Sequence, residues 1–271
     1  MTRLSWFNVV SLTLGFAFLY IPMIILITFS FNESKLVTVW AGFSTKWYGE
    51  LIRNEAFLDA AWVTIKVAVL SSTAATVLGT MAAYVIVRGG RFFGRTLFSG
   101  MIYAPLVMPE VITGLSLLLL FIAIGLDRGV FTIVLAHTTF AMCYVSVVVS
   151  SRLVSFDRSV EEAALDLGCT PLEAFRLVTL PIIFPAVLSG WLLAFTLSLD
   201  DLVIASFTAG PSSTTLPIKI FSSVRLGVSP EINALSTIMI AIVAVGVISA
   251  SLITKRSIAR QAREAHEAVR A

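Results

Sequence analysis

Three carboxylates lie inside long apolar stretches of the sequence, which makes them the first candidates for chemistry. Glu110 lies in the apolar stretch 97–125, and Asp200 and Asp201 lie in the stretch 182–208. A charged side chain at membrane depth costs at least about 2.5 to 3.5 kcal/mol on insertion scales, and such a residue marks a functional site by default. At low effective dielectric, a carboxylate about 4 Å from a cation stabilises it by several kcal/mol. The three acids therefore indicate a site that could bind positive charge.

Each acid also has a structural interpretation, which the sequence leaves open. Glu110 follows Pro109, and its carboxyl group could satisfy backbone groups that a proline kink frees. Asp200 or Asp201 could cap a break in a helix or pair with a partner subunit. Adjacent residues of a helix point about 100° apart, so only one of the two aspartates is expected to face a pore squarely.

The elements that carry these acids are predicted to be membrane helices. Of the 271 residues, 58% are hydrophobic and 13% are charged, against about 25% charged in a soluble domain. A transmembrane helix needs about 20 apolar residues, and the predicted spans cover residues 6–31, 60–87, 97–125, 130–151, 182–208 and 232–254. We therefore expect an all-α integral membrane protein with a single transmembrane domain over residues 1–271 and six transmembrane helices, which leaves no room for a soluble catalytic domain.

The distribution of basic residues predicts the orientation of these spans. If both termini are cytoplasmic, twelve Lys and Arg residues lie on the cytoplasmic side and six on the outer side. Basic residues are enriched in cytoplasmic loops. The sequence therefore predicts an N-in, C-in topology, in which residues 152–181 form a cytoplasmic loop.

This cytoplasmic loop has the pattern of two short helices with defined ends. The predicted capping residues are Ser159 with Glu162 at the first helix, Gly168 at its end, and Thr170, Pro171 and Glu173 at the second. Leu172, Phe175 and Val178 give the second helix an apolar stripe, and Pro181 is expected to close the unit. Such a helix could bind a groove of a partner or lie on the lipid surface.

The same loop carries a motif of a known family. Glu162-Ala163-Ala164, three residues, Gly168, nine residues and Val178-Thr179-Leu180-Pro181 resemble the EAA loop of ABC importer permeases, with Val in place of Ile. The resemblance implies the MetI-like permease fold and a coupling helix that sits in a cleft of an ATPase subunit. The residues expected to couple to the ATPase are Glu162, Ala163, Ala164, Gly168, Pro171, Leu180 and Pro181.

Other segments narrow the resemblance. Residues 105–114, 198–201 and 210–217 resemble bacterial polyamine permeases, above all the second permease subunit of putrescine systems. A polyamine is a flexible chain with ammonium groups at its ends, which carboxylates along a path would bind. The resemblance thus implies a substrate path with Asp201, Asp200 and Glu110, in which Asp201 is expected to have a slightly larger effect than Asp200.

The resemblance also implies the partners. The expected assembly in the bacterial inner membrane contains a cytoplasmic ABC ATPase dimer, a second homologous and different permease subunit, and a periplasmic polyamine-binding protein. The chain has no G-x-x-x-x-G-K-[ST] loop, so ATP is expected to bind a partner and no cofactor, metal or nucleic acid is expected here. His137 and His266 have no ligand cluster nearby in sequence and are interpreted as structural.

Two alternatives stay open at this point. The same architecture could carry another substrate, such as spermidine, iron or an amino acid. In a different class, the chain could be a membrane receptor or scaffold that recruits a soluble partner without transport, and ATPase-dependent uptake would separate that class from a transporter.

Overall fold

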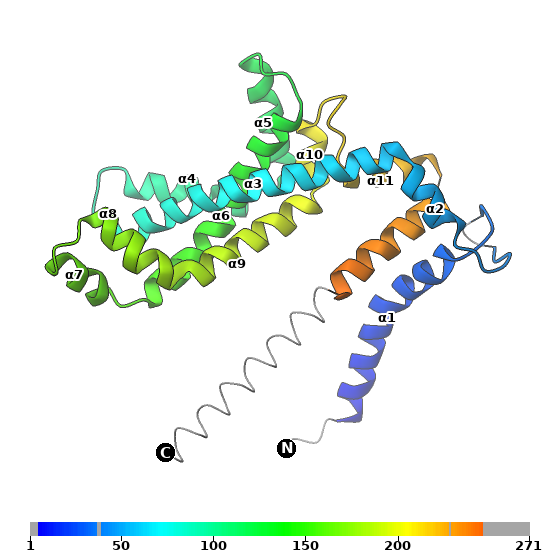
Figure 1. The fold of residues 1–271 in the computed structure, drawn as a ribbon, viewed down its shortest axis with the longest axis horizontal. Coiled ribbons are helices and arrows are strands. Elements are labelled where there is room, and N and C mark those ends of the chain that lie inside the picture. The colour runs from blue at the N-terminus through cyan, green and yellow to red at the C-terminus, as the bar shows by residue number, and fades with distance from the viewer. Residues whose placement is uncertain (1–4, 37–38, 228, 246–271) are drawn as a thin grey trace. The chain divides into compact units, whose positions relative to one another are not determined.

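The computed structural model describes residues 5–36, 39–227 and 229–245. Within these ranges every regular element is a helix, apart from an isolated β-bridge between Asn32 and Phe43 (Figure 1). The described residues form two compact units, one from the ranges 5–36, 39–55, 223–227 and 229–245 and one from residues 56–222.

The first unit contains α1 (Trp6–Ser30), α2 (Lys46–Arg53) and a helix over Pro230–Val245. At about 1.5 Å per residue, α1 is about 37 Å long, enough for a hydrocarbon core of about 30 Å. The hydroxyls of Ser30 and Tyr48 lie 2.7 Å apart, so α2 is hydrogen-bonded to the C-terminal end of α1. Asn54, which follows α2, donates to the Glu231 carboxylate at 3.1 Å. The short helix α2 therefore connects the two longer helices of this unit.

The second unit is a bundle around α6 (Val130–Ser155). The other helices that lie wholly or mostly in this unit are α3 (Glu55–Arg88), α4 (Arg95–Val107), α5 (Glu110–Ala123), α7 (Ser159–Asp166), α8 (Pro171–Ala174), the π-helical turn η1 (Phe175–Thr179), α9 (Leu180–Leu199), α10 (Val203–Thr208) and α11 (Leu216–Leu226). Helix α6 packs against α9, α4, α10 and α5. Val145, Val149 and Leu153 of α6 are fully buried beside Ile183 of α9. This core positions the candidate site residues described below.

Small residues allow the helices of the second unit to pack closely. A Cβ atom on Gly79 of α3 would lie 2.6 Å from the backbone oxygen of Met142 and 2.8 Å from the Cβ of Val145, both on α6. Ala75 of α3 and Ala141 of α6 are fully buried in the same core. Membrane helices associate through such small residues because lipid provides no hydrophobic driving force between helices.

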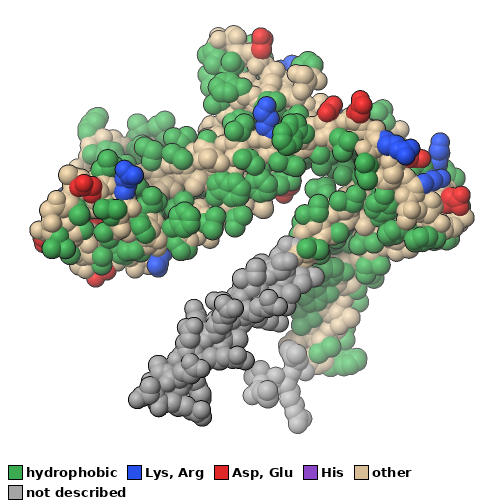
Figure 2. Space-filling view, in the orientation of Figure 1, with side chains coloured by type: hydrophobic (Ala, Val, Ile, Leu, Met, Phe, Trp, Pro, Cys, Tyr) green, Lys and Arg blue, Asp and Glu red, His purple; other side chains and the backbone are tan. Residues whose placement is uncertain are grey.

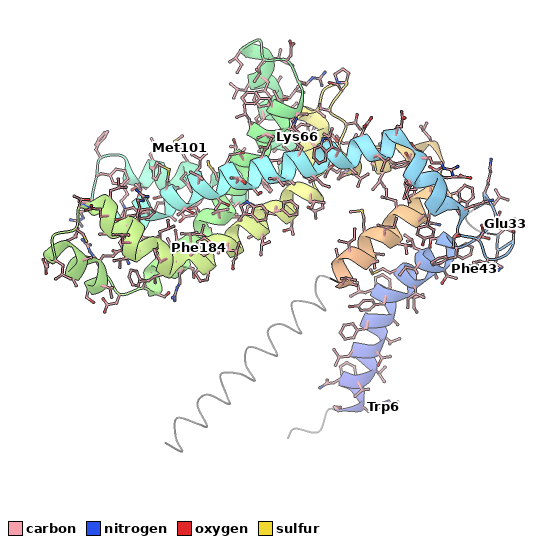
Figure 3. The ribbon with its side chains drawn as sticks, in the orientation of Figure 1. Trp6, Glu33, Phe43, Lys66, Met101 and Phe184 are labelled. Atoms are coloured by element: carbon pink, nitrogen blue, oxygen red, sulfur yellow. The ribbon has the colours of Figure 1, made fainter. Side chains whose placement is uncertain are left out.

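The outer surface of this bundle is suited to lipid. Figure 2 shows hydrophobic side chains over much of the second unit, with most charged side chains at its ends, at the end that carries α7 and α8, at the tip of α5 and near the start of α3. Met101 on α4 and Phe184 on α9 are large exposed side chains of this kind (Figure 3). The surface pattern therefore agrees with a multi-pass membrane protein.

The described residues contain fewer continuous spans than the six expected. Four helices are long and apolar enough to cross a membrane, namely Trp6–Ser30, Glu55–Arg88, Val130–Ser155 and Pro171–Leu199, and the pair α4 and α5 would add a fifth if it counts as one span. The sixth expected span, 232–254, is described only to Val245, and residues 246–254 lie outside the described part. The prediction of six spans is therefore confirmed only in part.

The predicted span 97–125 is not one continuous helix, and it breaks at Pro109, where the sequence suggested a proline kink. Helices α4 and α5 are bent by 116° at a break between Val107 and Glu110. Pro109 has no N–H to donate and disfavours the helical conformation in the residue before it. Met108 is accordingly extended, with ψ 136°. Pro105, in contrast, is accommodated inside α4.

The close approach at Gly79 can be tested by adding one methyl group. Gly79→Ala is expected to lower the free energy of unfolding by about 1 to 3 kcal/mol, the usual cost of overpacking, because the contacted oxygen belongs to the backbone of α6. The matched control is Gly100→Ala on α4, where no atom lies within 4 Å of the added Cβ. Thermal unfolding of the detergent-solubilised protein measures both, and equal midpoints would contradict this packing.

Candidate functional site

The first helix of the loop 152–181, α7, begins differently from the predicted capping box. Ser159 is its first helical residue, and the Asp157 carboxylate accepts the Ser159 N–H at 3.0 Å. The pKa of Asp157 is lowered because the backbone N–H and the hydroxyl of Ser159 both donate to it. The prediction that Ser159 caps the helix is therefore wrong by two residues, since an aspartate at this place also satisfies a free N–H.

The turn after α7 has the conformation expected from Gly168. This residue has φ +92°, in the left-handed region. The N–H of Gly168 donates to the Leu165 oxygen at 3.0 Å and that of Cys169 donates to the Ala164 oxygen at 3.1 Å. These two bonds form a Schellman motif, in which glycine is favoured because it has no Cβ atom.

The start of the second helix is confirmed. Glu173 accepts from the N–H of Thr170 at 2.8 Å, and the Thr170 hydroxyl accepts from the N–H of Glu173 at 3.4 Å. The pKa of Glu173 is lowered because the N–H and the hydroxyl of Thr170 donate to its carboxylate. Pro171 occupies the first turn, as expected.

Pro181 does not close this helical unit. The π-helical turn η1 connects α8 to α9, so that residues 171–199 form one helix. Pro181 has no N–H to donate, and the widened turn before it redirects the N–H of Leu180 to the Phe175 oxygen. Phe175 also packs edge-to-face on Tyr84 of α3, with ring centroids 5.0 Å apart. Phe175, one of the three residues of the expected apolar stripe, is thus covered by Tyr84 of the same chain.

The loop is fixed to the bundle by a buried ion pair that the sequence did not indicate. Nε of Arg88, at the end of α3, lies 2.7 Å from Oε2 of Glu161, and both side chains are about one-tenth exposed. Thr179 donates to the other Glu161 oxygen at 2.7 Å, and Arg88 also donates to the backbone oxygen of Phe156 at 3.1 Å. Both Glu161 oxygens are therefore bound inside the chain.

The expected coupling residues differ in their exposure. Glu162, Ala163, Gly168, Pro171 and Pro181 are exposed, Leu180 is half-buried and Ala164 is buried. Glu162 forms an exposed pair with Arg158, four residues earlier, at 3.1 Å. Ala164 is therefore a packing residue, whereas the exposed set can contact another protein.

Exposed leucines extend this surface. Leu165, Leu167, Leu172 and Leu177 are all exposed. Only Leu172 belongs to the stripe predicted from sequence spacing, because the turn at Gly168 and the widened turn at η1 change the faces that the other residues occupy. Together with Glu162, these leucines form one exposed surface, which is called the docking surface below.

The two adjacent aspartates lie in a break between α9 and α10, where the predicted span 182–208 is interrupted. Asp201 accepts from the N–H of Ala205 at 2.7 Å and from that of Ile204 at 3.3 Å, so it caps α10. Its Oδ2 lies 3.1 Å from Nε2 of His137, and the Asp201 side chain is 8% exposed. Asp200 is exposed. The two acids are therefore in different environments, and the reason is the break itself, since the 100° offset expected along a continuous helix does not apply here.

Glu110 is the first residue of α5 and follows the break at Pro109. Its side chain is exposed. Helix α5 packs on α10, where the position of a Cβ on Gly114 lies 2.6 Å from the Phe207 ring. Both broken helices thus carry an exposed carboxylate beside the break.

His137 is the residue that sequence reasoning missed here. It is buried on α6, and Nδ1 lies 2.7 Å from the Ser198 hydroxyl while Nε2 faces Asp201. The separation of 64 residues between His137 and Asp201 leaves no signal in spacing. His266 lies outside the described residues.

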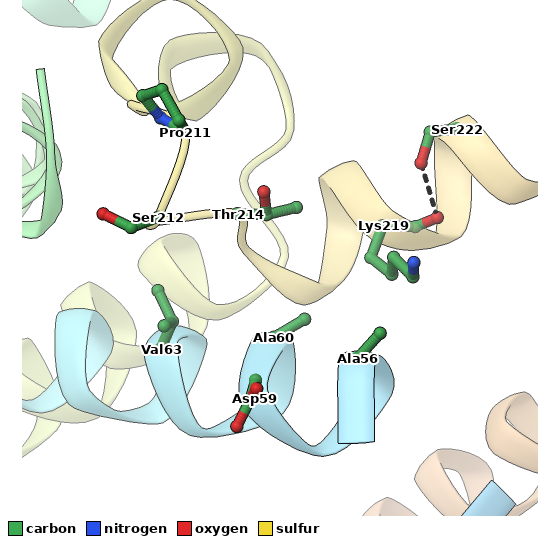
Figure 4. Close-up of a pocket in the computed structure, with 9 residues that line it drawn as sticks. All are labelled: Ala56, Asp59, Ala60, Val63, Pro211, Ser212, Thr214, Lys219 and Ser222. Atoms are coloured by element: carbon green, nitrogen blue, oxygen red, sulfur yellow. Dashed lines mark hydrogen bonds between the residues drawn. The ribbon is translucent and has the colours of Figure 1, made fainter. Parts of the chain in front are cut away.

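Another pocket of the second unit is lined by one acidic and one basic side chain. It has a volume of about 390 Å³ and lies between the start of α3 and the segment 211–222 (Figure 4). Asp59 of α3 and Lys219 of α11 line it, and the Lys219 ammonium lies 5.6 Å from the Phe57 ring centroid. Such a pocket could bind polar side chains of a partner.

Comparison with known proteins assigns the family. The family model for the binding-protein-dependent transport system inner membrane component matches residues 75–263. The chain belongs to this family. The matched residues include the loop with Glu162 and Gly168 and the break with Asp200 and Asp201.

Two relatives and one solved structure agree with this assignment. The putrescine transport system permease protein PotI of Escherichia coli (strain K12) is 60% identical over 252 residues, which cover 91% of this chain and 89% of PotI. The spermidine/putrescine transport system permease protein PotC of the same strain is 44% identical over 244 residues, 90% of this chain and 92% of PotC. These relatives are permease subunits of transport systems and not enzymes.

A bacterial ABC transporter involved in the import of the acidic polysaccharide alginate has the same fold. The likeness has a TM-score of 0.71 at 18% identity and covers 93% of this chain and 98% of the solved chain. The permease fold expected from the EAA loop is therefore confirmed.

The buried ion pair at the loop gives a test of stability. Glu161→Gln is expected to lower the free energy of unfolding by about 3 to 5 kcal/mol, because it leaves the Arg88 guanidinium buried without a counter-charge. The neighbouring variant Glu162→Gln breaks only an exposed pair and is expected to cost under about 1 kcal/mol. Thermal unfolding in detergent compares them. If both variants unfold at the same temperature, Arg88 and Glu161 do not anchor the loop.

Proposed function

We propose that this chain is the membrane-spanning permease subunit of an ATP-driven importer that moves putrescine into the cytoplasm. The observation that carries the proposal is the 60% identity to PotI over nearly the whole chain. The docking surface and the exposed acids at the two helix breaks support it, because such a subunit needs a surface for the ATPase and groups that bind a cationic substrate.

The docking surface supports binding to an ABC ATPase dimer. It exposes Glu162 and four leucines on a loop that a buried ion pair fixes to α3. A helix with an exposed apolar face binds a groove of a partner. The chain itself has no phosphate-binding loop of the G-x-x-x-x-G-K-[ST] type. ATP would therefore be bound and hydrolysed by the ATPase subunits.

The proposed substrate path includes Asp200, Asp201 and Glu110. In transporters, substrate sites are commonly formed where membrane helices are interrupted, and both breaks of this unit carry an exposed carboxylate. The ammonium groups at the two ends of putrescine would bind such carboxylates. The exposure of Asp200 favours it as the acid that contacts substrate, whereas the hydrogen bonds of Asp201 argue for a supporting role.

The proposed assembly contains two further proteins. A second homologous permease, different from this chain, would complete the path, and exposed apolar side chains on α1 and the bundle offer surface for it. A periplasmic polyamine-binding protein would dock on the outer segments 32–59 and 209–231, which include the pocket with Asp59 and Lys219. This assignment assumes that both termini are cytoplasmic and that the membrane is the bacterial inner membrane.

Spermidine is the second candidate substrate, because PotC is 44% identical to this chain. Uptake of labelled putrescine and of labelled spermidine by proteoliposomes that contain the assembled transporter separates the two. Faster uptake of spermidine would overturn the choice of putrescine. A complex that binds its partners but transports neither amine when ATP is supplied would support the scaffold alternative.

The turn at Gly168 provides a test of coupling. Gly168→Val is expected to reduce uptake at least about tenfold, because a β-branched residue at φ +92° strains the turn that orients the docking surface. Gly168→Asn is the matched control, since Asn tolerates the left-handed conformation. Uptake and ATPase binding are measured for both. Normal transport by the Val variant, with normal binding of the ATPase, would exclude this coupling role.

The exposed acids provide a test of substrate binding. Asp200→Asn and Glu110→Gln are each expected to raise KM for putrescine about tenfold or more, because each removes a charge that attracts an ammonium group at low dielectric. Asp127→Asn is the control, an exposed acid of the turn after α5. Concentration-dependent uptake gives KM for all three. Normal KM values for Asp200→Asn and Glu110→Gln would show that these acids are structural.

A further inference from the structure

A row of buried polar contacts crosses the second unit and ends on Asp201. The Ser71 hydroxyl of α3 donates to the Ser198 hydroxyl of α9 at 3.0 Å, and Ser198 lies 2.7 Å from Nδ1 of His137. Nε2 of His137 then lies 3.1 Å from Oδ2 of Asp201, a close polar contact that is not aligned as a hydrogen bond. His137 is thus hydrogen-bonded to α9 on one side and lies against the Asp201 carboxylate on the other.

These polar contacts are costly to disrupt because the side chains that make them are buried. Ser71 is fully buried, and His137 and Ser198 are at most 5% exposed. Buried polar groups need partners, since an unpaired one costs the full price of its desolvation. Asp201 in turn uses the same oxygen for His137 and for the N–H of Ala205. His137 therefore fixes the carboxylate that holds the start of α10.

We propose that His137 is a positioning residue for substrate binding, which holds Asp201 at the break and thereby leaves Asp200 as the acid that contacts an ammonium group. This inference rests on the proposed function of Asp200. His137 does not contact the substrate itself and acts only through Asp201. The two adjacent carboxylates thus have different roles, since Asp201 is held within the protein and Asp200 is left to bind the substrate.

The adjacency of Asp200 and Asp201 explains why their different roles matter for substrate binding. Asp200 and Asp201 are consecutive residues, so a change in the backbone at Asp201 also moves Asp200. Without a donor at the position of His137, the Asp201 carboxylate keeps only the N–H groups of α10 and is free to turn toward the substrate. The break then presents two like charges in variable positions, and a single ammonium group no longer meets one fixed acid.

Two amide substitutions of His137 test the inference. The amide nitrogen of Gln reaches about as far as Nε2 and can still donate to Asp201, whereas that of the shorter Asn corresponds to Nδ1 and cannot. We expect His137→Gln to keep KM for putrescine within about twofold of the wild type and His137→Asn to raise it about fivefold to tenfold, a size typical of coupling between residues in contact. Uptake is measured with the complete transporter in proteoliposomes. Equal KM values for the two variants would overturn the proposal.

A double-mutant cycle shows whether His137 acts through Asp201. If it does, His137→Asn combined with Asp201→Asn is expected to raise KM no further than Asp201→Asn alone. Effects that multiply would overturn the inference, because they indicate two independent roles. Ser146→Ala is the control on the same helix, since its buried hydroxyl has no hydrogen-bond partner among the described residues, and it is expected to leave KM unchanged.

Asp200→Asn distinguishes failure of this inference from failure of the proposed function. A normal KM in Asp200→Asn rejects Asp200 as a substrate ligand and, with it, the positioning role that depends on it. A raised KM in Asp200→Asn together with a normal KM in His137→Asn rejects only the role of His137. The His137→Gln variant also controls for folding, because it replaces the same buried imidazole.

Discussion

Hydrogen bonding inside lipid is the constraint on which the rest of this structure depends. A helix that stops at membrane depth exposes backbone N–H groups that no water can satisfy. At the break between α9 and α10, the Asp201 carboxylate accepts two of these N–H groups and also contacts His137. The interruption of the helix is therefore possible because an acid lies within it. The same interruption leaves Asp200 accessible beside it.

The end of the bundle that carries α7 satisfies its buried polar groups in the same way, with different residues. Glu161 has both oxygens bound inside the chain, one by Arg88 and one by Thr179. A buried charge of this kind is stable only with complete partners. Glu161 binds Arg88 and Thr179 inside the protein, whereas the adjacent Glu162 is exposed. In each of the two places, one of two neighbouring acids is thus buried with its partners inside the chain and the other is exposed.

Local features of the site could be predicted from sequence, and distant ones could not. The cap at Thr170 and the turn at Gly168 depend on residues within five positions, so spacing alone indicates them. The cap by Asp157 was assigned to Ser159 because both residue types favour this place. Arg88 and Glu161 are 73 residues apart, and His137 and Asp201 are 64 apart. Only packing of α3, α6 and α9 brings these pairs together.

The spans show the same limit at a larger scale. Hydropathy located the apolar stretches well, but it does not indicate where a helix bends or ends within such a stretch. Pro109 bends the third stretch by 116°, and Asp200 and Asp201 end α9 early. Breaks of this kind depend on which polar groups are satisfied after folding, and a window average of hydropathy contains no such information.

The continuity of residues 171–199 has a mechanical consequence. At about 1.5 Å per residue, this 29-residue helix is about 43 Å long. Its first turn belongs to the docking surface and its last residue precedes Asp200. If the helix tilts as one body by about 10° about its first turn, its other end moves by about 7 Å. A small rotation at the docking surface would then move Asp200 by more than the diameter of an ammonium group.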